Sequence, residues 1–145
     1  MAIRVLVADD QAMIRGALAG LLDLESDIEV VAQASDGARA LEELARLASA
    51  GGPARASAPV DVAIIDVEMP HMDGITATQA ICSRFPGVRV LIVTTFGRPG
   101  YLQRALDAGA TGFMVKDAPV EALAHGVRTV ASGGRAIDQS LALEA

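Results

Sequence analysis

Acidic, basic and hydroxyl side chains stand where apolar runs of the sequence end. They are Asp9 and Asp10 after "IRVLVA", Asp66 at the end of "VDVAIID", Thr94 at the end of "VRVLIVT" and Lys116 after "GFMV". Two adjacent aspartates disfavour each other's ionisation, so the pair calls for a counter-charge. Carboxylate oxygens without His or Cys suit Mg²⁺, which takes one or two carboxylates together with waters and phosphate oxygens. The residue types therefore predict a metal-binding site at Asp9 and Asp10.

The remaining groups indicate an anion beside that metal. Thr94 supplies a hydroxyl donor and Lys116 an ammonium, and both follow apolar runs as the acids do. A carboxylate nucleophile, a divalent cation, a lysine and a hydroxyl donor together suit phosphoryl transfer onto aspartate, where catalysis is mostly positioning and charge neutralisation. Asp66 is the candidate nucleophile.

Alternating strands and helices must position these residues. The apolar, β-branched runs predict strands at Ile3 to Ala8, Ile28 to Ala34, Val60 to Asp66, Val88 to Thr94 and Gly112 to Val115. Helical spacing between them predicts five amphipathic helices with these inward-facing residues: Ile14, Leu18 and Leu21; Ala38, Leu41 and Leu44; Ile75, Thr78 and Ile81; Leu102, Ala105 and Leu106; and Val120, Leu123, Val127 and Val130. Strict alternation predicts an α/β fold with a doubly wound, five-stranded parallel sheet. Ligands bind beyond the carboxyl ends of such strands, so the polar residues should converge in one crevice.

Composition limits the class of protein. A chain of 145 residues that is 52% hydrophobic fits one domain, and its net charge of -6 opposes binding to phosphate backbones or anionic membranes. A single cysteine, Cys82, excludes an internal disulfide and a cysteine-based zinc site. Asp9 and Asp10 interrupt the apolar stretch that a signal peptide would need, and no apolar segment reaches spanning length. We expect a cytoplasmic protein without a membrane partner.

Two segments depart from the compact pattern. Residues Ala48 to Pro59 are rich in Ala, Gly, Ser and Pro, and they predict a mobile surface insertion. The Gly pair after Ser132 should end the fifth helix, so residues 133–145 are expected to form a tail or the start of a linker.

Four motifs together resemble the receiver domains of two-component response regulators. They are "ADD" at 8–10, "DVEMPHMDG" at 66–74, "TTF" at 94–96 and "VKD" at 115–117, and the similarity runs from Ile3 to about Ser132. The resemblance implies a receiver domain at 1–132 with the flavodoxin-like strand order 2-1-3-4-5. It also implies a phosphoacceptor that takes part in Mg²⁺-dependent phosphotransfer and autodephosphorylation, and not an enzyme in the usual sense.

The resemblance assigns a role to each matched residue. Asp66 would accept a phosphoryl group from a sensor histidine kinase. Mg²⁺ would be held by Asp9, Asp10, Asp66 and the backbone carbonyl of Glu68. Thr94 and Lys116 would contact the phosphoryl oxygens, and Thr94 and Phe113 would form the conformational switch.

The stretches "VKDA" and "TTFGRPGY" are similar to NarL/LuxR-type regulators, and the second to the DesR group among them. In those proteins the receiver precedes a helix-turn-helix DNA-binding domain. That resemblance implies control of transcription, with DNA contacted only through a C-terminal domain absent from this chain. The alternative is a free-standing receiver that acts by protein–protein interaction.

The acidic residues are also compatible with three other interpretations. Asp9 and Asp10 alone could be helix N-caps. A haloacid-dehalogenase-type phosphatase would need a second Asp two residues after its nucleophile, where Glu68 stands. A flavodoxin-like electron carrier would need a neutral phosphate loop in place of the two aspartates.

Two helix faces that are not assigned to the core predict a homodimer that forms on phosphorylation. The candidate surface consists of Met13, Gly20 and Leu24 on the first helix and Ala124, Arg128 and Ala131 on the fifth. The alternative surface is the fourth helix around Tyr101 and Arg104, with the fifth strand and the fifth helix.

Overall fold

A computed structural model describes residues 2–95 and 100–137 of the chain. The strands are β1 (Ile3–Ala8), β2 (Ile28–Ala34), β3 (Val62–Asp66), β4 (Arg89–Thr94), β5 (Gly112–Val115) and β6 (Ala136–Ile137). The helices are α1 (Ala12–Asp23), α2 (Gly37–Ala50), α3 (Gly74–Arg84), α4 (Tyr101–Ala108) and α5 (Val120–Ala131), with a short 3₁₀ turn, η1 (Pro53–Arg55).

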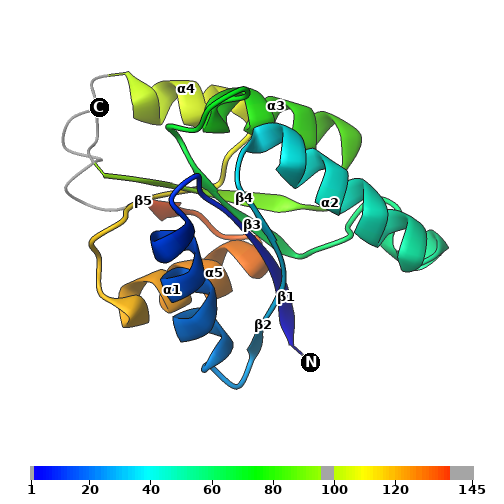
Figure 1. Ribbon diagram of the computed structural model, residues 1–145, viewed down its shortest axis with the longest axis horizontal. Helices are drawn as coiled ribbons and strands as arrows, with labels where there is room; N and C mark the ends of the chain where they lie inside the picture. The colour runs from blue at the N-terminus through cyan, green and yellow to red at the C-terminus, as the bar shows by residue number, and fades with distance from the viewer. Residues whose placement is uncertain (1, 96–99, 138–145) are drawn as a thin grey trace.

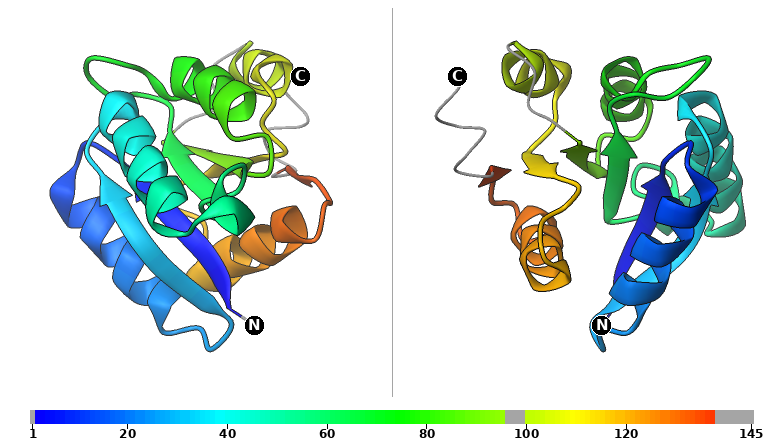
Figure 2. Two further views of the ribbon diagram at one scale, coloured as in Figure 1. Left: turned by 90° about the vertical axis from the view of Figure 1, so that its right-hand side faces the viewer. Right: turned by 60° about the vertical axis from the view of Figure 1, so that its left-hand side comes forward.

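The strands form one parallel sheet in the order β2-β1-β3-β4-β5-β6. Helices α1 and α5 cover one face, and α2, α3 and α4 cover the other (Figures 1 and 2). The doubly wound fold and the order 2-1-3-4-5 are therefore confirmed. The sheet differs from the expectation by the two-residue strand β6, which pairs with β5 and falls inside the predicted tail.

Alternating side chains of the central strands pack into two separate cores. In β1, Leu6 and Ala8 face the core under α2, α3 and α4, whereas Val5 and Val7 face the core under α1 and α5. Strands β3 and β4 alternate in the same way. A strand buried on both faces has no polar side, which explains why these segments read as continuous apolar runs.

The buried face of α1 differs from the prediction. Ala19 and Leu22 are buried, whereas Ile14 and Leu21, expected in the core, are 37% and 44% exposed. The helix is apolar on nearly every side, so helical spacing alone did not identify the face that packs on the sheet.

The segment predicted as an insertion is partly regular. Helix α2 continues to Ala50, and η1 follows within the segment. The amide of Gly87 donates a hydrogen bond to the carbonyl of Ser57 (2.8 Å), so the connection is tied to the loop before β4.

Candidate functional site

The sheet register brings the predicted site residues to one edge. Asp66 is the last residue of β3, Thr94 is the last residue of β4, and Asp9 directly follows β1. Oxygens of Asp9, Asp10 and Asp66 all lie within 4.8 Å of one another. The predicted convergence of three carboxylates is thus a feature of the structure.

The loop after Asp66 returns close to the backbone of this residue. Gly74, the first residue of α3, donates its amide to the carbonyl of Val67 (2.8 Å). A Cβ at position 74 would collide with the backbone carbonyl of Asp66, so only glycine allows this close return of the chain. The side chain of Asp73 accepts a hydrogen bond from the amide of Thr76 (2.8 Å) and caps α3.

Lys116 places its ammonium between two carboxylates. Its Nζ lies 3.0 Å from Oδ2 of Asp66 and 2.7 Å from Oδ2 of Asp9. Its amide donates to the carbonyl of Thr94 (2.8 Å), which fixes the loop after β5 against the end of β4. Lys116 therefore supplies the counter-charge that the aspartates require, and it links the ends of β5, β1 and β3.

Burial and charge act in opposite directions on the pKa values of this pair. Burial raises the pKa of Asp66 above its ordinary value, and the hydrogen bond and charge of Lys116 only partly offset that rise. Burial lowers the pKa of Lys116, but Asp9 and Asp66 outweigh it and leave the pKa raised. The lysine is therefore protonated at neutral pH.

Asp9 and Asp10 differ in exposure although they are adjacent. The side chain of Asp9 is buried and accepts a hydrogen bond from the amide of Gln11 (2.9 Å), whereas that of Asp10 is exposed. Asp10 thus keeps carboxylate oxygens open to an incoming cation. An oxygen-only set with one exposed and two buried carboxylates fits a hard divalent cation such as Mg²⁺.

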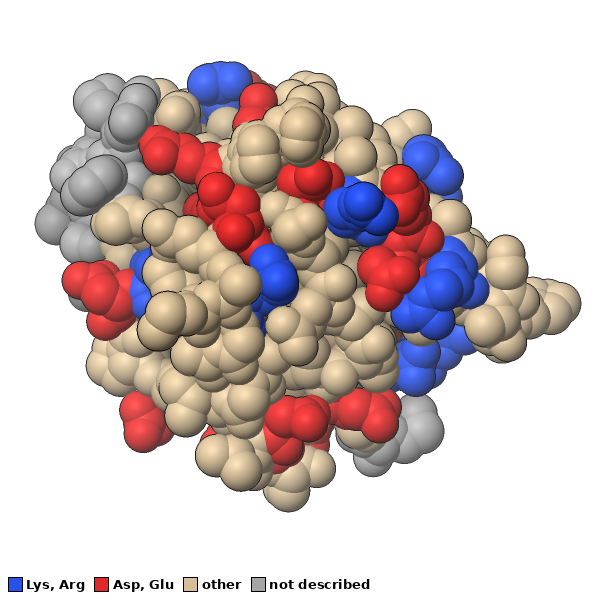
Figure 3. Space-filling model, viewed as in Figure 1, with Lys and Arg blue, Asp and Glu red and all other residues tan. Residues whose placement is uncertain are grey.

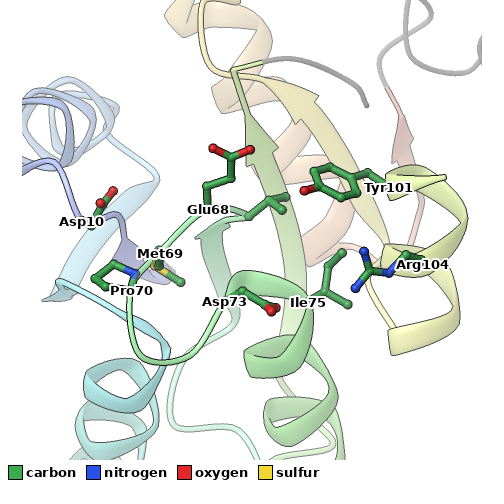
Figure 4. A pocket seen from close by; sticks show the side chains of 9 residues that line it. Asp10, Glu68, Met69, Pro70, Asp73, Ile75, Tyr101 and Arg104 are labelled. Carbon is green, nitrogen blue, oxygen red and sulfur yellow. The ribbon is translucent and has the colours of Figure 1, made fainter. Parts of the chain in front are cut away.

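The site opens into a hollow of about 180 Å³. Its lining consists of Asp10, Gln11, Asp66, Glu68, Thr94, Thr95 and Lys116. Gln11 and Thr95 were not predicted, although each adjoins a residue that was. A larger hollow of about 540 Å³ lies beside it, between the loop after β3 and helix α4 (Figure 4). Asp10, Glu68 and Asp73 contribute acidic groups to its lining, and Tyr101 and Arg104 come from α4.

Phe113, the predicted switch residue, is completely buried in the core under α2, α3 and α4. The stretch that resembles the DesR group contains residues 96–99, which lie outside the described residues.

The predicted dimer surface is present on α1 but only partly on α5. Met13 and Leu24 are 89% and 79% exposed, and open space surrounds Gly20. Figure 3 shows a largely uncharged area over α1. Ala124, in contrast, is fully buried against the sheet, so its assignment to the surface was wrong: the apolar face of α5 is broader than the spacing suggested.

The other two residues assigned to α5 are partly exposed. Ala131 packs at the margin of the core. Arg128 is occupied within the chain, because its guanidinium donates to Asp27 (2.7 and 2.8 Å) and to Glu25 (2.8 Å).

A parallel sheet wound on both sides, with aspartates, a lysine and a threonine at its carboxyl edge, defines a receiver-type α/β domain. The chain belongs to the response regulator receiver domain family, whose model matches residues 5–128. Among the described residues, no helix is both long and apolar enough to cross a membrane.

Curated relatives include transcriptional regulators of Bacillus subtilis. The chain is 38% identical to the uncharacterized transcriptional regulatory protein YvfU over 139 residues, which cover 96% of this chain and 64% of YvfU. It is 39% identical to the transcriptional regulatory protein DesR over 133 residues, which cover 92% of this chain and 60% of DesR. The chain therefore spans only about three-fifths of the length of these relatives.

Solved structures agree with this placement. The receiver domain of the putative response regulator NarL from Mycobacterium tuberculosis has a TM-score of 0.79 and 34% identity, over 91% of this chain and 98% of that one. A LuxR-family response regulator from Aurantimonas sp. SI85-9A1 has a TM-score of 0.84 and 26% identity, over 99% of this chain and 95% of that one. The chain is thus a receiver domain similar to those of NarL/LuxR-family regulators.

Proposed function

We propose that Asp66 is the phosphoacceptor of a two-component signalling system and receives its phosphoryl group from a sensor histidine kinase. The observation that carries the proposal is the position of Lys116, whose Nζ contacts the carboxylates of Asp66 (3.0 Å) and Asp9 (2.7 Å) at the carboxyl edge of the sheet. Of the three clustered acids, Asp66 ends the strand between β1 and β4, so it faces both the acidic pair and Thr94.

The transfer requires little covalent chemistry from the protein. A carboxylate oxygen of Asp66 attacks the phosphorus of a phosphohistidine, and a P–O bond forms as the P–N bond breaks. The electron pair of that bond stays on the imidazole of the donor, which takes up a proton from solvent. Lys116 and Thr94 line the hollow where the phosphoryl oxygens would lie, so they can neutralise and orient the transferred group.

Asp9, Asp10, Asp66 and the backbone carbonyl of Glu68 are the proposed ligands of Mg²⁺. When bound, the ion would neutralise charge on the transferring phosphoryl group. The exposed carboxylate of Asp10 is suited to be a direct ligand, while the buried Asp9 already contacts Lys116 and the amide of Gln11.

The signal leaves the domain through a change of conformation and of oligomeric state. Movement of Thr94 toward the phosphoryl group would shift the population between two conformations, with Phe113 as the second switch residue. The active conformation favours a homodimer through α1, where Met13 and the C-cap residue Leu24 are highly exposed.

The output is control of transcription in the cytoplasm by a DNA-binding domain. Support comes from the relatives, which are named transcriptional regulatory proteins and extend well beyond the region matched here. Residues 1–132 then form the receiver, and residues 133–145 begin the linker. A free-standing receiver acting by protein–protein contacts is the alternative. Sequencing the gene beyond codon 145 separates the two.

The phosphoacceptor assignment is tested by mass spectrometry of the intact chain after incubation with acetyl phosphate and Mg²⁺. We expect a mass increase of one phosphoryl group in the wild type and none in Asp66→Asn. A label that persists in Asp66→Asn overturns the assignment. Omitting Mg²⁺ or adding a chelator should also abolish labelling.

A further inference from the structure

An arginine outside the predicted site contacts the backbone of the acidic pair. Arg15, the fourth residue of α1, donates a hydrogen bond from Nη1 to the backbone carbonyl of Asp9 (2.7 Å). This is a charged donor on a neutral acceptor, a stronger class of hydrogen bond than an uncharged pair. The bond therefore ties the acidic loop to the body of the helix that follows it.

The remaining polar groups of Asp9 are fixed by other elements. Its amide donates to the carbonyl of Ala34 at the end of β2 (3.0 Å), and Oδ1 accepts from the amide of Gln11 (2.9 Å). Its Oδ2 contacts the ammonium of Lys116 (2.7 Å). Only the carbonyl depends on Arg15, so Arg15 completes the fixation of this residue.

The carbonyl of Asp9 belongs to the same planar peptide group as the amide of Asp10. A hydrogen bond that fixes this oxygen therefore also fixes the orientation in which the chain enters Asp10. The side chain of Asp10 is exposed. Among the described residues, none donates a hydrogen bond to its carboxylate. Its direction consequently depends on the backbone that carries it.

We infer that Arg15 is a positioning residue of the metal site, which acts by orienting the Asp9–Asp10 peptide so that Asp10 presents its carboxylate to the cation. The inference rests on the proposed function, because it assumes that the three carboxylates bind Mg²⁺. Groups that orient metal ligands without touching the metal typically contribute 10- to 100-fold to affinity.

The structure also offers a matched control. Arg15 and Arg39 both line a polar hollow of about 380 Å³ at the carboxyl end of β2, where Arg15 comes from α1 and Arg39 from α2. Arg39 is paired with Glu42 (3.6 Å) on the surface of α2 and does not contact the acidic loop in the described structure. Substituting Arg39 removes one positive charge from the same hollow, as substituting Arg15 does, but it leaves the hydrogen bond to the Asp9 carbonyl in place.

The test is a calorimetric titration of Mg²⁺ into the unphosphorylated protein. Arg15→Met should weaken Mg²⁺ binding by about tenfold, and Arg39→Met should leave it within about twofold of wild type, as expected for an exposed charge. Arg15→Lys, which keeps a charged donor, should recover part of the affinity. Wild-type affinity in Arg15→Met, or equal losses in Arg15→Met and Arg39→Met, overturns the inference.

A second measurement separates positioning from a general effect on folding. In the background Asp10→Asn, Arg15→Met should cause no further loss of Mg²⁺ affinity, because its effect passes through Asp10. The melting temperature without Mg²⁺ should change little, while the increase on adding Mg²⁺ should shrink. An equal drop in melting temperature with and without Mg²⁺ would show a structural role only. If the wild type binds no Mg²⁺, the proposed metal site itself fails.

Discussion

Replacing Lys116 by methionine would leave two buried carboxylates facing each other without a counter-charge. Methionine keeps much of the length of the lysine stem but carries no donor. The side chains of Lys116, Asp9 and Asp66 are only 10%, 1% and 5% exposed, so water cannot replace the lost ammonium well. We therefore expect the folded state to be destabilised.

The magnitude follows from the burial of the group. Removing one partner of a buried ion pair costs about 3 to 5 kcal/mol, and the lower end applies here because the mouth of the site is open to solvent. We expect the free energy of unfolding to fall by about 3 kcal/mol, a large part of the 5 to 15 kcal/mol typical of a domain. Urea unfolding followed by circular dichroism at pH 7, with divalent ions chelated, measures it.

The double variant Lys116→Met/Asp66→Asn is the control. It also removes one of the two negative charges, so it should recover most of the lost stability. Lowering the pH should have a similar effect on Lys116→Met alone. Burial already raises the pKa of Asp66 in the folded state, and loss of Lys116 raises it further. A group with a raised folded pKa binds a proton more tightly when folded, so stability increases as the pH falls toward the unfolded value of 3.8. Wild-type stability of Lys116→Met at pH 7 would refute this account of the site.

Three other changes test separate parts of the molecule. Leu24→Asp, at the exposed C-terminal cap of α1, should prevent phosphorylation-driven dimerisation in light scattering but leave Asp66 labelling intact; normal dimers would favour the α4 surface instead. Gly74→Ala should destabilise the fold by about 1 to 3 kcal/mol in urea unfolding, because the added methyl group meets the Asp66 carbonyl. Arg128→Met should lower the melting temperature at pH 7. Arg128 lowers the pKa of Asp27 below 3.8, so the stabilisation by this pair should be lost as Asp27 becomes protonated below pH 3.8. A difference in melting temperature between Arg128→Met and wild type that is as large at pH 2 as at pH 7 would contradict this.

The convergence of the site could be predicted because it depends on strand ends. In a parallel sheet all carboxyl ends meet at one edge, so locating four apolar runs was enough to bring Asp66, Thr94 and Lys116 together with the acidic pair. The contacts of Lys116 with Asp9 and Asp66 follow from that arrangement. The roles that these residues have in phosphorylation remain predictions.

Other features depend on information that local patterns do not carry. Helix α1 is apolar on most sides, so the pattern could not show that Leu22 faces the core and Leu21 the solvent. Arg128 pairs with Asp27, 101 residues away in the chain, and no helical spacing encodes such a contact. The bond from Arg15 to the Asp9 carbonyl involves a backbone acceptor, which every residue offers equally. Strand β6, with two residues, is too short to show any periodicity.

Lys116 is the only lysine in the sequence, and every other residue counted as Lys or Arg is an arginine. Isotopic labelling of lysine would therefore place a single side-chain NMR probe in the protein, and the ion pairs with Asp9 and Asp66 hold it at the centre of the site. Reagents that acylate amines have only this ammonium and the N-terminal amine as targets, and here the ammonium is shielded by two carboxylates. The rate of acylation at Lys116 would thus report directly on when the lysine leaves its partners, without any engineered label.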